Sequence, residues 1–183
     1  VTVSTERFVL TVTAVNDRPS VAVDAGRTGK EGRASLFTAD PPRAADVESG
    51  PSDLTYALTA SPVHGELYDR GAGAAITTEE TFTQADLNGG SIEYRHDDSE
   101  TTADSFQVVA EDRGGARTDT TTFEITVAPV NDAPMAAIDS VETDEDQSVV
   151  IDVLENDTDP ERAIDTSSIE VTDRPVTGSV SVD

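Results

Sequence analysis

The feature that most constrains this chain is a five-residue segment that occurs twice, each time after an alternating run of apolar and polar residues. It reads Val-Asn-Asp-Arg-Pro at 15–19 and Val-Asn-Asp-Ala-Pro at 130–134. The runs before it, 8–14 and 122–127, have the period of two that is typical of a half-buried β-strand. Because proline cannot donate a ladder hydrogen bond and Asn and Asp favour turns, each copy ends a strand and begins a linker. The two copies therefore predict the boundaries of an internal repeat.

These boundaries divide the 183 residues into five parts. We expect 1–15 to be the closing strand of a preceding repeat and 16–19 to be a linker. One complete repeat is expected at 20–130, a second linker at 131–134, and the first part of a following repeat at 135–183. Most aromatic residues fall in the complete repeat, which therefore has the large side chains for a core of its own. We interpret the chain as a segment of a longer array.

Within the complete repeat, period-two patterning predicts seven strands, near 20–25, 33–38, 53–59, 64–69, 91–96, 104–111 and 119–128. A single helical turn is expected at Thr83–Leu87. Short strands separated by frequent turn signals indicate an all-β fold, an antiparallel β-sandwich of the immunoglobulin-like type. The expected core consists of the large inward-facing residues Leu36, Tyr56, Leu58, Leu67, Ile92, Tyr94, Phe106, Val108, Phe123 and Ile125. In the last part, strands are expected at 148–154, 168–172 and 178–182.

The charge balance narrows the classes of partner. Thirty-seven acidic residues against twelve basic ones give a formal net charge of −25, which argues against nucleic acid as a partner. So much like charge opposes the compact state unless it is compensated, which favours cation binding. A high-salt habitat explains the same composition and is compatible with cation binding. No apolar run is long enough for membrane insertion, and the lack of cysteine excludes disulfides and thiolate metal sites.

Several motifs follow one another in the complete repeat: Leu54-Thr-Tyr-Ala-Leu, Pro62-Val-His-Gly-Glu-Leu, Phe82-Thr-Gln-Ala-Asp-Leu, Ile92-Glu-Tyr-Arg-His-Asp, Asp104-Ser-Phe and the closing Val-Asn-Asp-Ala-Pro. In this order they resemble the cadherin-like repeat of chondroitin sulphate proteoglycan type, over about 20–134. The last part contains Asp144-Glu-Asp-Gln-Ser, Val153-Leu-Glu-Asn-Asp-Thr-Asp-Pro-Glu and Pro175-Val-Thr-Gly. It resembles the cadherin-like repeats of large bacterial surface and adhesion proteins. The resemblance implies immunoglobulin/cadherin-like sandwiches in tandem.

Cadherin-type repeats are extracellular modules that bind Ca²⁺ at the joints between domains, where oxygen ligands from both neighbours gather. The resemblance therefore implies two sets of ligands. Those expected at the second linker are Glu31, Asp98, Glu100, Asn131, Asp132, Asp157 and Asp159. Those expected at the first linker are Asn16, Asp17, Asp46, Glu48 and Asp112. Within these sets Asp46-Val-Glu48 and Asp157-Thr-Asp159 correspond to one family motif, Asp-x-Asp.

Two departures from the family pattern reduce the number of ligands. Val15 and Val130 replace a polar linker residue, and each linker reads Asn-Asp rather than Asp-Asn. We therefore expect one or two ions per joint rather than three. The alternative is that these acids only cap turns and solvate loops.

The expected function is a structural, Ca²⁺-stiffened spacer in a long surface or adhesion protein that is secreted or exposed on the cell surface. Its expected partners are neighbouring repeats of the same protein, with other copies or a cell-surface or matrix ligand as further possibilities. No catalytic signature frames the Ser, His and Asp residues, so we do not expect an enzyme. The alternative is a carbohydrate- or matrix-binding accessory module of a secreted enzyme. Such a module needs an exposed aromatic platform, whereas the aromatic residues here alternate in phase with the expected core.

Overall fold

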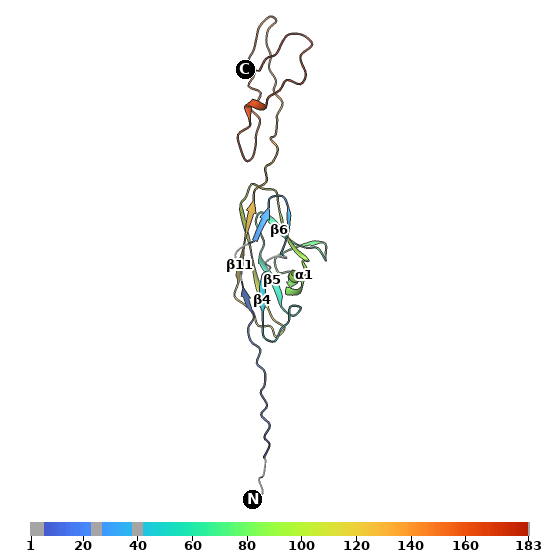
Figure 1. The fold of residues 1–183 in the computed structure, drawn as a ribbon, viewed down its shortest axis with the longest axis vertical. Helices are drawn as coiled ribbons and strands as arrows, with labels where there is room; N and C mark the ends of the chain where they lie inside the picture. Colours follow the sequence, from blue (N-terminus) through green and yellow to red (C-terminus); the bar gives the residue numbers. More distant parts are fainter. Residues whose placement is uncertain (1–5, 23–26, 38–41, 183) are drawn as a thin grey trace. The chain divides into compact units, whose positions relative to one another are not determined.

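β-Strands make up nearly all of the regular structure, which confirms the expected all-β class (Figure 1). The structure is a computed structural model and describes residues 6–22, 27–37 and 42–182. The chain divides into a first unit, Val1–Pro129, and a second unit, Val130–Asp183. The described residues contain an α-helix, α1 (Gln84–Gly89), and a 3-10 helix, η1 (Thr166–Ser168). Neither has the length or the apolar composition that crossing a membrane requires.

Three sheets form within the described part of the first unit. The largest has the order β2 (Arg27–Lys30), β11 (Thr121–Ala128), β10 (Ala103–Glu111), β5 (Thr55–Ala60) and β8 (Thr81–Thr83). The second has the order β3 (Ala34–Leu36), β9 (Ile92–His96), β6 (Gly65–Asp69) and β7 (Ala74–Ile76). The third pairs β1 (Ser20–Ala22) with β4 (Arg43–Ala45). Neighbouring strands are antiparallel except β2 and β11, which are parallel.

One hydrophobic cluster joins the two larger sheets into a sandwich. Tyr56 and Phe106 of the five-stranded sheet and Leu67 and Tyr94 of the four-stranded sheet are all buried in it. The ring centroids of Phe106 and Phe123 lie 5.2 Å apart in a stacked arrangement. Such burial is the dominant favourable term in folding, so the core expected from the alternation of large side chains is the one that holds this unit together.

One residue of the expected core is misplaced. Leu36 is only half-buried, and its neighbour Phe37 is buried in its place. The register explains the difference, because Leu36 lies opposite Glu93 on β9, whereas Ser35 lies opposite the core residue Tyr94. Directly opposite residues of an antiparallel pair share a face, so Leu36 faces outward. The other nine expected core residues are buried.

All seven expected strands of the complete repeat are present, although 23–25 and 38 lie outside the described residues. Four further strands, β2, β4, β7 and β8, occupy segments that we expected to be bends, loops or unassigned. Each has only three or four residues, too few to show a period. Helix α1 replaces the expected single turn, and Thr83 caps it by exchanging hydrogen bonds with Asp86 in a capping box.

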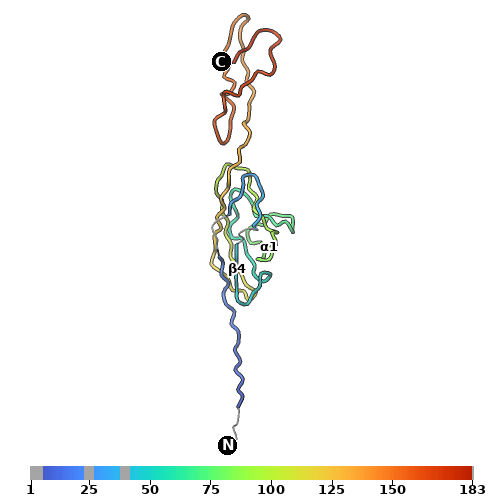
Figure 2. The backbone as a smooth tube through the Cα atoms, in the orientation of Figure 1, coloured from blue at the N-terminus to red at the C-terminus, as the bar shows by residue number. Residues whose placement is uncertain are grey.

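The chain enters the first unit at one end and leaves it at the other, as Figure 2 shows. At the entry, Asn16 contacts the turn that follows β10. At the exit, the backbone N–H of Glu31 donates to the carbonyl oxygen of Ala128, the last residue of β11, at 3.1 Å. Because β10 and β11 are the longest strands and run the length of the sandwich, they separate two groups of acidic residues, one at each end.

The second unit contains little regular structure. Among the described residues 130–182 there is no strand, only an isolated bridge between Met135 and Thr158 and the short helix η1. The strands expected at 148–154, 168–172 and 178–182 are therefore wrong. None of these described residues is buried, and apolar side chains such as Ile138, Val150 and Val176 are largely exposed. Without an opposing apolar layer, an alternating segment gains too little from burial to hold a sheet together.

Candidate metal site

The acids expected at the first linker come together at the entry end of the first unit. Strand β1 begins directly after the linker, and β4 ends directly before Asp46; the pairing of Ser20 with Ala45 places these two points side by side. Strand β4 is in turn fixed from the core, because the N–H of Ala44 donates to the hydroxyl oxygen of Tyr56 at 2.6 Å and to Oε1 of Gln84 at 2.7 Å. We call Asn16, Asp17, Asp46, Glu48 and Asp112 the linker cluster.

Asp46 and Glu48 form one side of the linker cluster. Oδ1 of Asp46 accepts from the N–H groups of Glu48 at 3.0 Å and of Ser49 at 2.7 Å, which holds the turn after β4. Oδ2 of Asp46 is buried, and no donor within the described ranges bonds to it. The carboxylate of Glu48 accepts from the N–H of Asp17 at 3.4 Å. Glu48 thus holds the linker backbone at Asp17, while Oδ2 of Asp46 could accept a cation.

Asp112 forms the other side. Its carboxylate accepts from Nδ2 of Asn16 at 2.8 Å and from the N–H of Ala116 at 2.9 Å. Burial by itself raises the pKa of Asp112, but hydrogen bonds from Asn16 and from the backbone of Ala116, Gly114 and Gly115 outweigh it, so this pKa lies below its usual value. A Cβ at Gly114 would collide with the Asn16 carboxamide. Glycine therefore permits this close approach of turn and linker.

Arg18 of the first linker forms its hydrogen bonds away from these acids. Its Nη2 lies 2.8 Å from Oδ1 of Asp119, and its Nε donates to the carbonyl oxygen of Arg117. Both partners belong to the segment between β10 and β11. Arg18 therefore ties the linker to the sandwich without neutralising the linker cluster.

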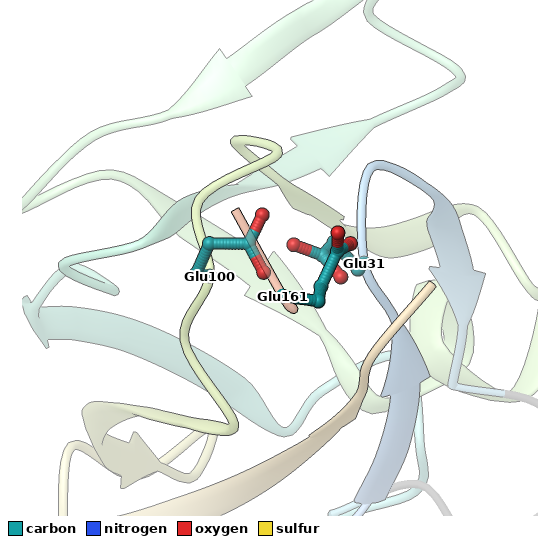
Figure 3. A group of neighbouring side chains, drawn as sticks. All are labelled: Glu31, Glu100 and Glu161. Carbon is teal, nitrogen blue, oxygen red and sulfur yellow. The ribbon is translucent and has the colours of Figure 1, made fainter. Parts of the chain in front are cut away.

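Glu31, Asp98 and Glu100, the exit cluster, lie at the opposite end of the first unit. Glu31 is buried in the turn after β2, whereas Glu100 is exposed on the loop between β9 and β10. Figure 3 shows Glu100 directed toward Glu31; the third labelled side chain, Glu161, belongs to the second unit. A carboxylate oxygen of Glu31 and one of Glu100 lie within 4.8 Å of each other. Two carboxylate oxygens at this separation can both ligate one hard cation.

His96 holds the two loops that carry the exit cluster. Its buried ring accepts, at Nδ1, from the N–H of Asp98 at 3.2 Å and from the N–H of Gly32 at 3.4 Å. Nδ1 therefore carries no proton, and Nε2, which lies 3.0 Å from Oγ1 of Thr101, carries it. Gly32 and Asp98 both have left-handed backbones, with φ of 56° and 70°. No sequence motif connects His96 with these acids.

Asp104 fixes the other end of the same loop. Its buried carboxylate accepts from the N–H groups of Val63 at 2.9 Å and of His64 at 3.0 Å, and from the hydroxyl of Tyr94 at 2.9 Å. Burial, followed by the hydrogen bond and charge of Asp104, raises the pKa of Tyr94, which therefore stays protonated as the donor. The loop with Asp98 and Glu100 is thus held at both ends by buried polar groups.

The second unit repeats the arrangement of the linker cluster. Oε1 of Glu161 accepts from the N–H of Asp132 at 2.7 Å, as Glu48 does from Asp17. Oδ1 of Asp159 accepts from the N–H groups of Glu161 at 3.1 Å and of Arg162 at 2.9 Å, as Asp46 does at its own turn. In both linkers Nδ2 of the asparagine donates to the next carbonyl oxygen, at 2.7 Å for Asn131. Nη2 of Arg162 also donates to Oδ1 of Asn131.

Sequence reasoning missed Glu161 and placed the second motif two residues early. The counterparts of Asp46 and Glu48 are Asp159 and Glu161, not Asp157 and Asp159. Oδ1 of Asp157 instead accepts from the N–H of Ala137 at 2.8 Å. The signal was available, because Asp-Pro-Glu at 159–161 has the same Asp-x-Glu form as Asp-Val-Glu at 46–48.

The linker cluster offers carboxylate and amide oxygens and the exit cluster offers carboxylate oxygens, the ligands that a hard cation such as Ca²⁺ prefers. Their sulfur-free, oxygen-rich chemistry does not suit softer metals that prefer thiolates. Acids of the linker cluster also accept hydrogen bonds from backbone N–H groups, so capping of turns is already one role of these residues.

Comparison with known families divides the chain at the same place as the structure. Residues 19–127 match a family described as cadherin-like, and residues 131–183 match one described as a bacterial Ig domain. The chain is 31% identical over 127 residues to the human protein named Extracellular matrix organizing protein FRAS1, covering 69% of this chain. It is 37% identical over 93 residues to human Chondroitin sulfate proteoglycan 4, covering 47% of this chain.

Extracellular matrix protein 3 of Lytechinus variegatus is 33% identical over 152 residues, covering 81% of this chain. The chain spans only 3% to 5% of the length of these three relatives. The similarity therefore concerns one segment of each of them.

Proposed function

Because the chain belongs to the cadherin-like family over residues 19–127, we propose that its first unit binds Ca²⁺ and acts as a stiffened spacer in an extracellular adhesion or matrix protein. The cation binds at the exit cluster, through the carboxylates of Glu31 and Glu100 with Asp98 beside them. A second cation binds at the linker cluster at the other end of the same unit.

The approach of Glu31 to Glu100 carries this proposal. Their carboxylate oxygens lie within 4.8 Å of each other although Glu31 is buried. A divalent cation that accepts one oxygen from each side chain joins the turn after β2 to the loop between β9 and β10, and carboxylate oxygens are the ligands that Ca²⁺ prefers. Buried His96 and Asp104 hold the loops in place before any cation arrives, so little of the binding free energy is lost in ordering them.

The linker cluster supports a mechanical role. Asn16 and Asp17 belong to the linker, whereas Asp46, Glu48 and Asp112 belong to the sandwich, and hydrogen bonds already join the two groups. A cation that adds oxygens from both groups fixes the linker to its unit more firmly. The second unit holds its own linker, at Asp132, through Glu161 in the same way. The recurrence of this arrangement in units that match different families favours a role in the linkers themselves.

An extracellular location follows from the relatives, whose printed names describe extracellular matrix proteins and a proteoglycan. Extracellular modules bind Ca²⁺ with dissociation constants of about 10⁻⁴–10⁻³ M. Adhesion or matrix assembly is accordingly the purpose we propose for the longer protein.

The alternative of a carbohydrate-binding module finds less support. Such a module needs an exposed aromatic ring for stacking, but Tyr56, Phe82 and Tyr94 are buried in the core of the sandwich. Phe8 is exposed, but it lies on the segment before the linker and not on the sandwich. The ring of Tyr68 is half-buried, and the guanidinium of Arg95 lies over it, 3.2 Å from the ring centroid. That face is therefore already occupied.

Calorimetric titration of the metal-free chain with Ca²⁺ tests the proposal. We expect saturable binding in the range given above, and a severalfold higher dissociation constant in Glu31→Gln and in Glu100→Gln. Glu124→Gln is the matched control, because Glu124 is exposed on β11 and the substitution removes the same charge. Mg²⁺ should bind more weakly, since it holds its waters and demands octahedral geometry. Equal titrations of all four proteins, or none that saturates, would contradict the proposal.

A further inference from the structure

The two larger sheets of the first unit end, within the described residues, in the edge strands β2, β3, β7 and β8. Strands β2 and β3 cover each other, since a Cβ at Gly29 on β2 would lie 3.4 Å from Oγ of Ser35 on β3. Strand β8 is followed at once by α1, which its Thr83 caps. Strand β7 pairs with β6 alone, and no hydrogen bond within the described ranges joins it to another segment. An open edge of this kind is a template for pairing with another chain.

Strand β7 lacks the features that usually block an open edge, which are charged side chains, proline or a β-bulge. Its residues, Ala74–Ile76, are uncharged, and their register with β6 is continuous. The surrounding stretch, Gly71-Ala-Gly-Ala-Ala-Ile-Thr-Thr78, contains no charged residue in a chain with a net charge of −25. Two copies of so acidic a chain repel each other, so an uncharged edge is where they can approach. Because β7 has only three residues, pairing through it is weak.

Charges of opposite sign flank the two ends of this stretch. Arg70 precedes it, and Glu79 and Glu80 follow it; all three are exposed. Arg70 and Glu80 lie equally far from Ala75 along the chain. An antiparallel pairing of two copies about Ala75 therefore turns the basic end of each strand toward the acidic end of the other. A parallel pairing would instead bring like charges together at both ends, which is destabilising.

We propose that β7 is a lateral docking edge for a second copy of this chain. The two copies pair antiparallel about a two-fold axis at Ala75, which joins their four-stranded sheets into one continuous sheet. Ala75 then lies opposite Ala75 of the second copy, and Ala74 of each copy lies opposite Ile76 of the other. Since the linkers leave from the ends of the sandwich and β7 lies along its side, the contact joins copies side by side. It uses no residue of the linker cluster or the exit cluster, so it is independent of calcium binding.

Sedimentation velocity of the full chain, in a chelator and at stepwise increasing concentration, tests this inference. We expect a reversible equilibrium between monomer and dimer. Ala75→Lys and Ala75→Glu should each raise the dissociation constant severalfold, because the two-fold axis places like charges directly opposite each other. An equimolar mixture of the two variants should associate again, since Lys then faces Glu. Recovery on mixing also excludes misfolding as the cause of the loss.

The matched controls are Ala103→Lys and Ala103→Glu, because Ala103 is an exposed alanine on β10 and lies in the other sheet. These variants should associate as the unsubstituted chain does, alone or mixed. A chain that stays monomeric at every concentration would overturn the inference, as would a mixture of the Ala75 variants that associates no better than either alone. Dimers that persist in Ala75→Lys would also overturn it, and would place the contact elsewhere, for example at residues 6–14.

A cross-link tests the register of the pairing. The chain has no cysteine, so Ala75→Cys introduces a single thiol. Directly opposite residues of an antiparallel pair have Cβ atoms about 4.5–5.5 Å apart, close enough for a disulfide after a small adjustment. Mild oxidation should therefore convert Ala75→Cys into a covalent dimer, and Ala103→Cys far more slowly. Equal rates for the two variants would contradict a two-fold axis at Ala75.

Discussion

At the residue scale, several buried polar side chains lie at the two ends of the sandwich, beside the loops that carry the acids. Asp112 is buried at the entry, and Glu31, His96 and Asp104 are buried toward the exit. Buried polar groups are costly unless they are hydrogen-bonded. Asp112, His96 and Asp104 meet this requirement with backbone N–H groups of the surrounding loops. They therefore determine the shape of the loops that carry the acids.

Asp112 gives a pH-dependent prediction. Its hydrogen bonds lower its folded-state pKa below the ordinary 3.8, so it stabilises the fold above that pH, and the contribution is lost as the pH falls through the folded pKa. Asp112→Asn should lower the melting temperature at pH 7. The new side-chain NH₂ group replaces an accepting oxygen, so it faces a donor, Asn16 Nδ2 or the Ala116 N–H, and that hydrogen bond is lost. The difference from the unsubstituted chain should shrink below about pH 4. Melting curves recorded in a chelator from pH 7 to pH 3 measure it.

The control for this series is Asp119→Asn. The Asp119 side chain is 96% exposed and pairs with the partly exposed Arg18, and such surface pairs contribute little to stability. A pH-independent effect of Asp112→Asn, or an equal effect of Asp119→Asn, would contradict the account of Asp112.

His96 gives a second prediction. His96→Phe keeps an aromatic ring in the core but removes the acceptor for the N–H groups of Gly32 and Asp98. Since a hydrogen bond contributes about 0.5–1.5 kcal/mol, we expect the free energy of unfolding to fall by about 1–3 kcal/mol in urea denaturation. His64→Phe should cost less, because the contact of the His64 ring with Oγ of Ser99 is long, at 3.4 Å. If the two variants were equally stable, His96 would not hold these loops.

The candidate site was only partly predictable from sequence, and for a physical reason. The acids lie in motifs, so twelve candidates could be placed by spacing and resemblance. The position of the backbone turn decides which acid meets the linker. Glu161 accepts from the N–H of the linker residue Asp132, whereas Asp157 accepts from that of Ala137. The role of His96 depends on hydrogen bonds to Gly32, 64 positions away. Local patterns carry no information about contacts of that range.

At the scale of elements, the length of a strand decides whether its sequence reveals it. β10 and β11 alternate over nine and eight residues, which is enough to show the period of two. β2 reads Arg-Thr-Gly-Lys and shows no apolar alternation; it is a strand because β11 offers it a ladder. In the second unit, segments with alternating apolar residues form no strand within the described residues 130–182, because no apolar surface packs against them.

The choice of which side chains near β3 face the core gives a third prediction. Phe37 is buried and meets the ring of Phe106 edge-on, with centroids 5.8 Å apart, whereas Leu36 faces outward. Phe37→Ala should therefore cost about 3–5 kcal/mol of unfolding free energy, as large-to-small core substitutions of aromatic residues do. Leu36→Ala is the matched comparison and should cost clearly less. Urea denaturation compares them, and an equal or reversed order would mean that the register of β3 with β9 is wrong.

At the scale of the whole molecule, the first unit combines one well-formed core with a net charge for the chain of −25. Such charge keeps a protein soluble and opposes its compact state at the same time. On the proposed function, cations at the linker cluster and the exit cluster relieve part of this repulsion. At a free Ca²⁺ concentration about 100 times the dissociation constant, one such site stabilises the bound form by about 2.7 kcal/mol.

The central claim, that Glu31 and Glu100 share a calcium ion, is tested most directly by following backbone amide resonances during a Ca²⁺ titration at constant ionic strength. The amides of residues 31–32 and 98–100 should shift together along one saturating curve, with a midpoint of about 10⁻⁴–10⁻³ M. They should shift far less in Glu31→Gln, while resonances at the linker cluster still respond. Shifts spread evenly over the acidic surface, or shifts of the same size when Na⁺ replaces Ca²⁺, would show that the exit cluster attracts cations without binding one.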